Sequence, residues 1–497
     1  MRVRFAKPPT ASDATIRRVT PSPAATLRQR AALVAGRLAR DTTRRLRRGG
    51  GTALPGLIAG TLAPDLIEAA GTLPGLGAVT VTGTNGKTTT THLLAAIARA
   101  EGWDPLTNRS GSNLARGLVT ALVDSAGVAG QIGDRAGRLG IYEVDESVLP
   151  TVFARLRPRV AVFLNLFRDQ LDRYGEIDSV AEGWAAMLAE TAGAPTLILN
   201  ADDPSVALLG EDAPGRVVWF GIDDPEVALP AQDHASDARF CRCGARLAHD
   251  LEFMGHVGHW SCPACGRRRA RAEVAATRVR LDADGSDVEI RVGESTHTLR
   301  VPTAGLYSVT NALAAIAAAH ALGIPADVAV AAVAEAGPAF GRQERLMVDR
   351  RHVRIWLAKN PAGLNEIVRA LLAPPAGNHA RQPEPRYLLA MLNDDIQDGK
   401  DVSWIYDADL ERLTAIGTVG ALVCSGTRAE DIALRFAIAG ITPDEVVAET
   451  QAALDAALER TPASGTLEVI ATYTAMIEVR EAVAARAGVA AYWEQPA

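Results

Sequence analysis

One stretch decides the fold of this chain: Val79-Thr80-Val81-Thr82-Gly83-Thr84-Asn85-Gly86-Lys87-Thr88-Thr89. Residues 79–82 form a short apolar run typical of a buried strand, and an Ala/Leu-rich amphipathic pattern typical of a helix continues to Ala100. A glycine loop in this position favours phosphate binding, because its backbone N–H groups and the helix N-terminus can face phosphate oxygens. We therefore expect nucleotide phosphate to bind at Gly83, Thr84, Asn85, Gly86, Lys87, Thr88 and Thr89.

Two side chains of this loop have chemistry that suits a nucleotide and its metal. Lys87 places a positive charge near the β- and γ-phosphates, and the Thr88 hydroxyl is a ligand for Mg²⁺. The general Walker pattern has a glycine five residues before Gly86, where this chain has Val81. A glycine turn that binds no nucleotide is the alternative interpretation, and the Gly-Lys-Thr triplet between a strand and a helix argues against it.

Outside this loop, short apolar runs alternate with amphipathic segments. Buried strands are expected at 160–164, 196–199, 353–357, 387–390, 421–423 and 467–470. This βαβ rhythm predicts an α/β fold with mainly parallel sheets covered by helices. A Cys/His/Gly/Arg-rich insert interrupts the rhythm at about 237–271, and we expect the rhythm to resume after it.

The length of 497 residues predicts two or three domains. We expect a basic N-terminal tail at 1–50, a central ATP-binding domain at 51–340 that contains the insert, and a Rossmann-like α/β C-terminal domain at 341–497. No run of 18 apolar residues exists, which predicts a cytoplasmic protein without a membrane span. We expect no nucleic-acid partner.

Positive charge is concentrated at the N-terminus. Residues 1–48 contain thirteen Arg or Lys and two acidic residues, within a chain whose net charge is −6. A solvated tail is the plain interpretation, with a short helix near 27–46. Attraction to anionic lipid is the alternative, at about 1 kcal/mol per basic residue near a membrane surface.

Four of the five cysteines lie within 25 residues, in the insert. Cys241-x-Cys243 and Cys262-x-x-Cys265, separated by 18 residues, are close to zinc-ribbon spacing. We therefore expect one structural Zn²⁺ held by Cys241, Cys243, Cys262 and Cys265. His256 and His259 are the substitutes if Cys241 cannot reach the metal, and four free thiols are the alternative.

The P-loop and four further motifs, in matching order, resemble the Mur ligase superfamily. The four are Tyr142-Glu143-Val144-Asp145-Glu146, Asn165-Leu166-Phe167-Arg168-Asp169-Gln170-Leu171-Asp172, Asn311-Ala312-Leu313-Ala314-Ala315 and Gly341-Arg342-Gln343-Glu344. The resemblance implies that Glu143 binds Mg²⁺, that Asn311 meets adenine and that Lys359 contacts ATP. Ordinary members hold a second Mg²⁺ with a carbamylated lysine, and this chain has no lysine between Lys87 and Lys359. Gln170, where that superfamily has histidine, also weakens a second metal site.

A narrower resemblance, to the MurT subunit family of lipid II isoglutaminyl synthases, covers roughly residues 48–480. It rests on Phe167-Arg168-Asp169-Gln170-Leu171-Asp172-Arg173-Tyr174-Gly175-Glu176, Lys359-Asn360-Pro361-Ala362-Gly363, Asp398-Gly399-Lys400-Asp401-Val402-Ser403-Trp404 and Thr472-Tyr473-Thr474-Ala475-Met476. The P-loop begins at Gly83, which leaves too little folded chain before it for the UDP-binding domain of ordinary Mur ligases.

The narrower resemblance implies a reaction and a partner. ATP would phosphorylate the α-carboxylate of D-glutamate in lipid II at the inner membrane face, and ammonia would displace the phosphate. A GatD-like glutaminase subunit would supply the ammonia as the other half of a heterodimer. The resemblance also implies that one aspartate of this chain orients the partner's catalytic histidine, and we expect Asp401, with Asp398 next.

Two other functions remain open at this point. One is a stand-alone ligase that joins an amino acid, as in folylpolyglutamate synthesis. The other is a nucleotide-binding scaffold without chemistry.

Overall fold

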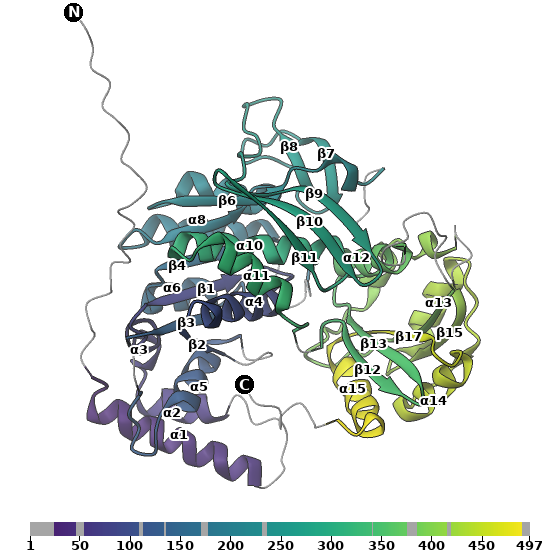
Figure 1. Cartoon of the computed structure of the whole chain (residues 1–497), viewed down its shortest axis with the longest axis horizontal. Helices are drawn as coiled ribbons and strands as arrows, with labels where there is room; N and C mark the ends of the chain where they lie inside the picture. Colours follow the sequence, from purple (N-terminus) through teal and green to yellow (C-terminus); the bar gives the residue numbers. More distant parts are fainter. Residues whose placement is uncertain are drawn as a thin grey trace, which may run out of the picture.

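The computed structural model describes residues 24–45, 54–108, 113–133, 136–169, 177–230, 236–339, 341–374, 385–414 and 419–489. These residues form two α/β bodies, a larger one around a nine-stranded sheet and a smaller one around a six-stranded sheet (Figure 1). Gln170 lies outside the described residues. The α/β fold expected from the sequence is confirmed.

The larger sheet has the strand order β11-β10-β9-β6-β5-β4-β1-β3-β2. Its strands are β1 (Ala78–Thr82), β2 (Asp104–Thr107), β3 (Arg138–Glu143), β4 (Val160–Phe163), β5 (Thr196–Asn200), β6 (Val217–Ile222), β9 (Val274–Asp282), β10 (Gly285–Val292) and β11 (Ser295–Val301). The strands from β2 to β9 pair in parallel. The P-loop follows β1, in the middle of the sheet, so it lies where the carboxyl ends of several strands meet.

The expected return of the βαβ rhythm after the insert is wrong. Strands β9, β10 and β11 are consecutive and antiparallel, without helices between them. Charged and polar residues such as Arg278, Arg280 and Glu289 alternate with buried apolar ones along these strands. That alternation suits strands with one face in water, which antiparallel hairpins allow.

Helices cover both faces of the larger sheet (Figure 1). One apolar core lies under α4 (Lys87–Ala100), α10 (Leu306–Leu322) and α11 (Ala326–Glu335). The other lies under α3 (Leu66–Thr72), α5 (Ala115–Ser125), α6 (Leu149–Leu156) and α8 (Ile177–Glu190). Short helical turns, α9 (Pro204–Ala207), η1 (Leu208–Asp212) and η2 (Pro225–Val227), follow β5 and β6. Helix α4 starts at Lys87 itself, so the P-loop lysine is fixed by the first turn of a buried helix.

The N-terminal segment is not a solvated tail over its described part. Residues 27–45 form α1 (Leu27–Arg45), which packs with α2 (Leu54–Leu62) onto α5. Ala32 and Leu33 are buried there, and Arg40 pairs with Asp124 at 2.9 Å. No helix among the described residues is long and apolar enough to cross a membrane.

The smaller sheet has the strand order β12-β13-β17-β14-β15-β16, and all pairs except β12–β13 are parallel. Its strands are β12 (Glu344–Val348), β13 (Arg351–Leu357), β14 (Arg386–Met391), β15 (Val419–Ser425), β16 (Glu445–Val446) and β17 (Thr466–Ala471). Around it lie α12 (Pro361–Leu372), α13 (Ala429–Ile438), α14 (Thr450–Arg460), α15 (Tyr473–Ala487) and the turns η3 (Ser403–Asp407) and η4 (Leu410–Leu413). β17 is the last strand among the described residues and lies between β13 and β14 in the sheet.

A buried ion pair joins neighbouring strands of this sheet. Arg354 on β13 and Glu468 on β17 are 3% and 0% exposed, and Arg354 Nε donates to Glu468 Oε2 at 2.8 Å. Trp356 Nε1 donates to the same oxygen at 2.6 Å. Arg354 also donates to the carbonyl of Ala283, in the larger body, so the pair also links the two bodies.

We expect Glu468→Gln to lower the free energy of unfolding by roughly 3–5 kcal/mol, because it leaves the Arg354 charge buried without its counter-ion. Urea denaturation of the purified protein measures this loss. The matched control is Glu445→Gln, which breaks the half-exposed pair with Arg460 and should cost less than about 1 kcal/mol. Equal stability of the two variants would show that the buried pair is not a principal support of the fold.

Candidate active site

The two glycines of the phosphate-binding loop are required by its close packing. Gly83 and Gly86 have φ values of 130° and 91°, a region that favours glycine. A Cβ on Gly83 would lie 2.9 Å from the backbone nitrogen of Asn165, and one on Gly86 would lie 2.0 Å from Asn311 Oδ1. The loop is therefore held between β4 and α10 with its backbone preset.

Lys87 lies inside this loop, in contact with carboxylates. Its Nζ donates to the Gly83 carbonyl at 2.6 Å and pairs with Glu146 Oε2 at 2.9 Å. Burial lowers the pKa of Lys87, but the attraction of Glu146 and Glu143 outweighs it and holds the pKa above its ordinary value. Burial raises the pKa of Glu146, and the charge of Lys87 opposes this. The ammonium therefore stays charged where a phosphate would lie.

Thr88 and Glu143 form a small oxygen-rich site beside Lys87. Thr88 Oγ1 donates to Glu143 Oε2 at 2.9 Å. Asn108 holds the Glu143 backbone from both sides, at 2.8 Å to its carbonyl and 2.9 Å to its N–H. A hydroxyl and a carboxylate suit Mg²⁺, which takes oxygen ligands and keeps water in its other positions. The residues therefore fit the expected metal.

The smaller body reaches the same loop. Asn360 exchanges side-chain hydrogen bonds with Asn85 of the P-loop, at 3.1 and 3.3 Å, and its Oδ1 also caps α12. Lys359 Nζ pairs with Asp169 Oδ2 at 2.5 Å, and its charge acts on Glu146. Residues about 275 positions apart in the chain are thus in direct contact at the nucleotide loop.

Two charged residues of the site were not singled out in the sequence. Glu146 is the direct partner of Lys87, although the motif Tyr142-Glu143-Val144-Asp145-Glu146 pointed to Glu143. Arg342, just before β12, is influenced by the carboxylate of Glu143. Burial lowers the pKa of Arg342 and Glu143 opposes this shift. The signal that could have found Arg342 was its place in the Gly-Arg-x-Glu stretch.

Asn311 lies on α10 with only 3% of its surface exposed, and its amide packs against Gly86. The structure thus brings Asn311 to the P-loop. Its contact with adenine stays a prediction. Thr84 contributes to the packing of the loop, since its Oγ1 accepts the Phe167 N–H at 3.0 Å. Thr89 lies in the first turn of α4.

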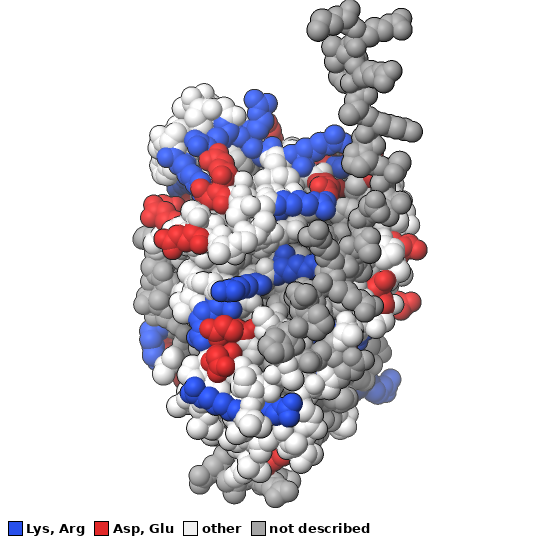
Figure 2. All heavy atoms as spheres, turned by 90° about the vertical axis from the view of Figure 1, so that its left-hand side faces the viewer, with Lys and Arg blue, Asp and Glu red and all other residues white. Residues whose placement is uncertain are grey.

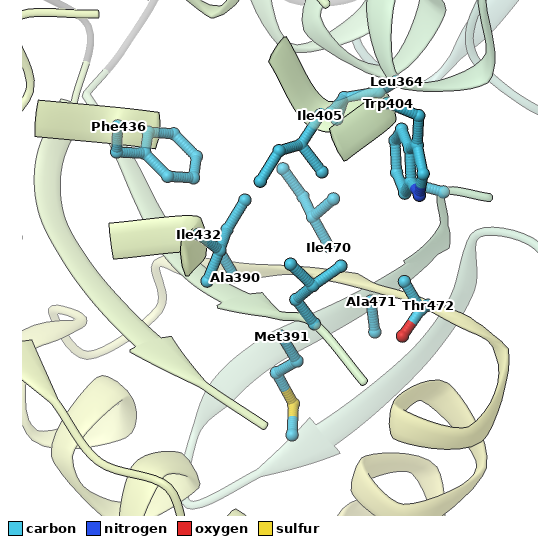
Figure 3. A pocket seen from close by; sticks show the side chains of 12 residues that line it. Leu364, Ala390, Met391, Trp404, Ile405, Ile432, Phe436, Ile470, Ala471 and Thr472 are labelled. Carbon is cyan, nitrogen blue, oxygen red and sulfur yellow. The ribbon is translucent and has the colours of Figure 1, made fainter. Parts of the chain in front are cut away.

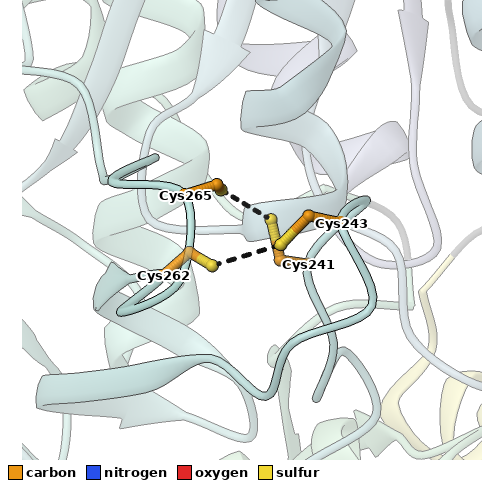
Figure 4. Close-up of side chains that lie close together, drawn as sticks. All are labelled: Cys241, Cys243, Cys262 and Cys265. Carbon is orange, nitrogen blue, oxygen red and sulfur yellow. Dashed lines mark hydrogen bonds between the residues drawn. The ribbon is translucent and has the colours of Figure 1, made fainter.

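The four insert cysteines converge, as Figure 4 shows. Their sulfurs lie within 4.8 Å of one another, with Cys241–Cys265 at 3.7 Å and Cys243–Cys262 at 3.5 Å. A tetrahedral ion with Zn–S bonds of about 2.3 Å places its sulfurs about 3.8 Å apart. Gly244 and Gly266 take positive φ after each half, which gives each pair a tight turn. The geometry fits a four-thiolate zinc site.

His256 and His259 belong to other contacts of the insert. It contains the hairpin β7 (Ala248–Met254) and β8 (Val257–Ser261). His256 is buried and lies 3.4 Å from Asp203, and its ring centroid lies 4.7 Å from that of Phe167, with the two ring planes tilted by 47°. His259 Nε2 contacts the Ile222 carbonyl at 2.8 Å. The hairpin therefore supports Phe167, which in turn holds the P-loop through Thr84.

We call the loop between β14 and η3, residues 392–402, the acidic loop. It holds its two candidate aspartates in different surroundings, one buried and one exposed. Asp398 is 5% exposed and accepts hydrogen bonds from Thr474, from its N–H at 2.9 Å and from its hydroxyl. Asp401 is exposed, and its Oδ1 accepts the Ser403 N–H at 2.8 Å. Hydrogen bonds from Ser403 lower the pKa of Asp401, so it is a carboxylate at neutral pH. Of the two, Asp401 is the one that a partner can reach.

A small cavity of about 20 Å³ lies under the same loop (Figure 3). Its lining is apolar, with Trp404, Ile405 and Phe436 on one side and Ile470 and Ala390 on the other. It is far too small for a nucleotide or a peptide, since sites for small molecules typically need about 300 Å³ or more. It is a packing gap in the smaller body, and the candidate active site is therefore the one around the P-loop.

Solved structures of similar fold include ligases. A pseudomurein peptide ligase type C from Methanothermus fervidus aligns over 82% of this chain and 78% of its own, with a TM-score of 0.60 and 22% identity. MurF ligase from Thermotoga maritima, solved in complex with ADP, aligns over 86% of this chain and 84% of its own, with a TM-score of 0.58 and 13% identity. At these identities the likeness shows the fold alone.

The sequence relatives are more specific. Residues 81–319 match the Mur ligase middle domain, and residues 357–476 match the MurT ligase C-terminal family. The lipid II isoglutaminyl synthase (glutamine-hydrolyzing) subunit MurT of Staphylococcus aureus is 30% identical, over 84% of this chain and 89% of its own length. The Streptococcus pneumoniae subunit of the same name is 29% identical, over 91% of this chain and 96% of its own length. This chain therefore belongs to the MurT family within the Mur-ligase-like α/β proteins.

Proposed function

We propose that this chain is the ATP-dependent ligase subunit of a lipid II isoglutaminyl synthase. The observation that carries the proposal is the convergence of both bodies on one phosphate-binding loop. Lys87, Thr88 and Glu143 come from the larger body, and Lys359 and Arg342 come from the smaller one or the junction before it. The charge of the cations suits phosphoryl transfer, and the MurT relatives carry the corresponding name.

The proposed reaction has two steps. First, the γ-phosphoryl group of ATP moves to an oxygen of the D-glutamate α-carboxylate, which gives an acyl phosphate and ADP. Ammonia then attacks the carbonyl carbon, phosphate leaves, and the amide loses a proton to become D-isoglutamine. The first step is needed because a carboxylate is a poor acylating agent. When bound, Mg²⁺ neutralises phosphate charge.

This chain's own residues position and neutralise the phosphates. Lys87 and Arg342 place positive charge at the loop, while Thr88 and Glu143 supply the oxygens for Mg²⁺. The backbone of residues 83–89 follows the nucleotide phosphates, and Asn311 and Lys359 complete the ATP site. Glu146 keeps Lys87 charged and oriented.

The ammonia would come from a GatD-like glutaminase subunit. Free ammonia is mostly protonated at neutral pH and is then no nucleophile, so release next to the ligase site is an advantage. We propose that exposed Asp401 completes the partner's Cys-His-Asp triad. The proposed enzyme is cytoplasmic and works at the inner face of the plasma membrane, where lipid II carries its stem peptide.

The test of the function is reconstitution with the glutaminase subunit, lipid II, ATP and glutamine. We expect ADP release and a D-isoglutamine product, both dependent on lipid II. Activity with an amino acid and none with ammonia would indicate a stand-alone ligase. Nucleotide binding with no substrate-dependent ADP release would indicate a scaffold.

We also propose that the insert binds one Zn²⁺ per chain through Cys241, Cys243, Cys262 and Cys265. A closed four-thiolate site is structural, and metal binding contributes directly to folding of such a segment. Because the insert supports Phe167 and thereby Thr84, it also stabilises the active site indirectly.

Elemental analysis of the purified chain should therefore find one zinc per chain, and Cys262→Ser/Cys265→Ser should lose it. Cys424→Ala is the matched control, because Cys424 is a buried thiol on β15 that is not part of the cluster. It should keep the full zinc content. Unchanged zinc in the double variant, or none in the native protein, would refute the site.

A further inference from the structure

Helix α1 presents an apolar side away from the protein. Leu27, Ala31, Val34 and Leu38 recur at intervals of four, three and four residues, so they lie along one face. Leu27 is 85% exposed and Leu38 is 65% exposed. The opposite face, with Ala32 and Leu33, is the one buried in the protein. The helix thus has an apolar face toward the protein and a second apolar face toward solvent.

Helix α2, which packs against α1, also has exposed leucines. Leu54, Leu57 and Leu62 are 44%, 51% and 49% exposed. The two helices lie side by side, and Arg28 of α1 donates to the Leu62 carbonyl at the end of α2. Both helices pack on α5, so their exposed sides lie away from it. We call Leu27, Leu38, Leu54, Leu57 and Leu62 the leucine face.

Exposed apolar side chains are clustered at the leucine face. Fourteen large hydrophobic side chains are exposed among the described residues, and the leucine face contains five of them within residues 27–62. A sixth, Val128, lies in the loop after α5, where Gly130 touches the Arg30 backbone of α1. Clustered exposed apolar residues mark an interaction surface, whereas single ones do not.

Helix α1 carries a net positive charge, with six arginines and one acidic residue, Asp41. It belongs to a segment, residues 1–48, whose sequence contains thirteen basic and two acidic residues. One of those acids, Asp41, is paired with Arg40 at 2.9 Å. Helix α2 has no charged residue. In Figure 2 the lower end of the molecule, where Figure 1 places α1 and α2, is mostly uncharged with Lys or Arg side chains across it.

We propose that the leucine face lies on an anionic membrane surface, with its leucines at the level of the lipid headgroups. Exposed leucines beside an excess of basic residues are the composition of helices that lie in the interface. Positive charge adds attraction to anionic lipid, which a neutral protein partner does not offer. The inference rests on the proposed function, because a lipid-linked substrate places the reaction next to that surface.

Co-sedimentation of the full chain with vesicles tests the proposal. The vesicles contain phosphatidylethanolamine alone or with roughly one third phosphatidylglycerol, which sets their negative charge. The native chain should bind the anionic vesicles more tightly, and salt should weaken the binding. Leu38→Glu/Leu57→Glu should bind at least about tenfold more weakly, because two exposed leucines that the membrane would bury are replaced by anionic side chains.

The matched control is Leu434→Glu/Ile438→Glu, two similarly exposed residues on α13 of the smaller body. It should bind vesicles like the native chain. Circular dichroism should show that both double variants fold, because all four side chains are on the surface. Both should also amidate a water-soluble substrate like the native enzyme. Because co-sedimentation requires no catalysis, it tests membrane binding even if the proposed reaction does not occur.

Three results would overturn the membrane proposal. The native chain does not bind anionic vesicles, or the two double variants bind them equally. In the third, the leucine variants lose a dimer or the glutaminase subunit in size-exclusion chromatography while vesicle binding is unchanged. That third result would assign the leucine face to a protein partner.

Discussion

Lys87→Ala is expected to lower ATP-dependent amidation by roughly a thousandfold or more, because it removes a fixed charge from the transferring phosphoryl group. The structure explains why no other group replaces it. Lys87 Nζ is held by the Gly83 carbonyl and Glu146, inside a loop that packs closely against Asn165 and Asn311. ADP release with ammonium chloride as the nitrogen source measures the loss without the glutaminase.

The variant leaves Glu146 buried without its cation, so stability needs its own control. The double variant Lys87→Ala/Glu146→Gln should be equally inactive and should melt close to the native protein. Lys400→Ala removes an exposed lysine whose Nζ donates to the Asp394 carbonyl, and it should keep native ammonia-driven activity. Native turnover in Lys87→Ala would remove this lysine from the mechanism.

Asp401→Asn should lower glutamine-dependent amidation by roughly 10⁴-fold, by analogy with the same swap in serine-protease triads. Ammonia-driven amidation should be unchanged. The two half-reactions separate because the carboxylate of Asp401 is exposed on the acidic loop, whereas activation of the substrate occurs at the P-loop. Product formation from glutamine and from ammonium chloride, measured in parallel on the complex, gives the ratio.

Asp398→Asn is the informative comparison. Asp398 is buried and holds Thr474 at the start of α15, so its loss should reduce stability and weaken both activities together. If Asp401→Asn also loses both activities, Asp401 supports the ligase fold instead of the partner. If it keeps both, the exposed carboxylate has no role in glutamine hydrolysis.

The sequence predicted most of the parallel strands because they are buried on both sides. Residues 160–164 are a continuous apolar run that spans β4 and the residue after it, residues 197–199 are one within β5, and residues 467–470 in β17 are apolar except for Glu468. The helix expected to end at Ala100 is α4. The antiparallel strands from β9 to β11 were missed, although their alternation of charged and apolar residues is the ordinary signal for such strands.

Contacts between distant segments were harder to predict. The many basic residues of α1 predicted a solvated segment. Ala32, Leu33 and Gly36, however, give that helix a face that packs against α2 and α5. Asp398 and Asp401 are the same residue type, three positions apart, so the sequence does not distinguish them. Only the fold shows that one meets Thr474 and the other meets solvent.

The position of β17 also affects how the protein is made. A ribosome releases the chain from its N-terminus, so β13 and β14 emerge well before the strand that lies between them. Until residue 471 is outside the exit tunnel, β13 and β14 have no common neighbour, and Arg354 lacks Glu468. Unpaired strand edges of this kind bind other chains. During translation, the smaller body therefore exposes unpaired strand edges until β17 is released, which makes this stage a natural point for chaperone binding.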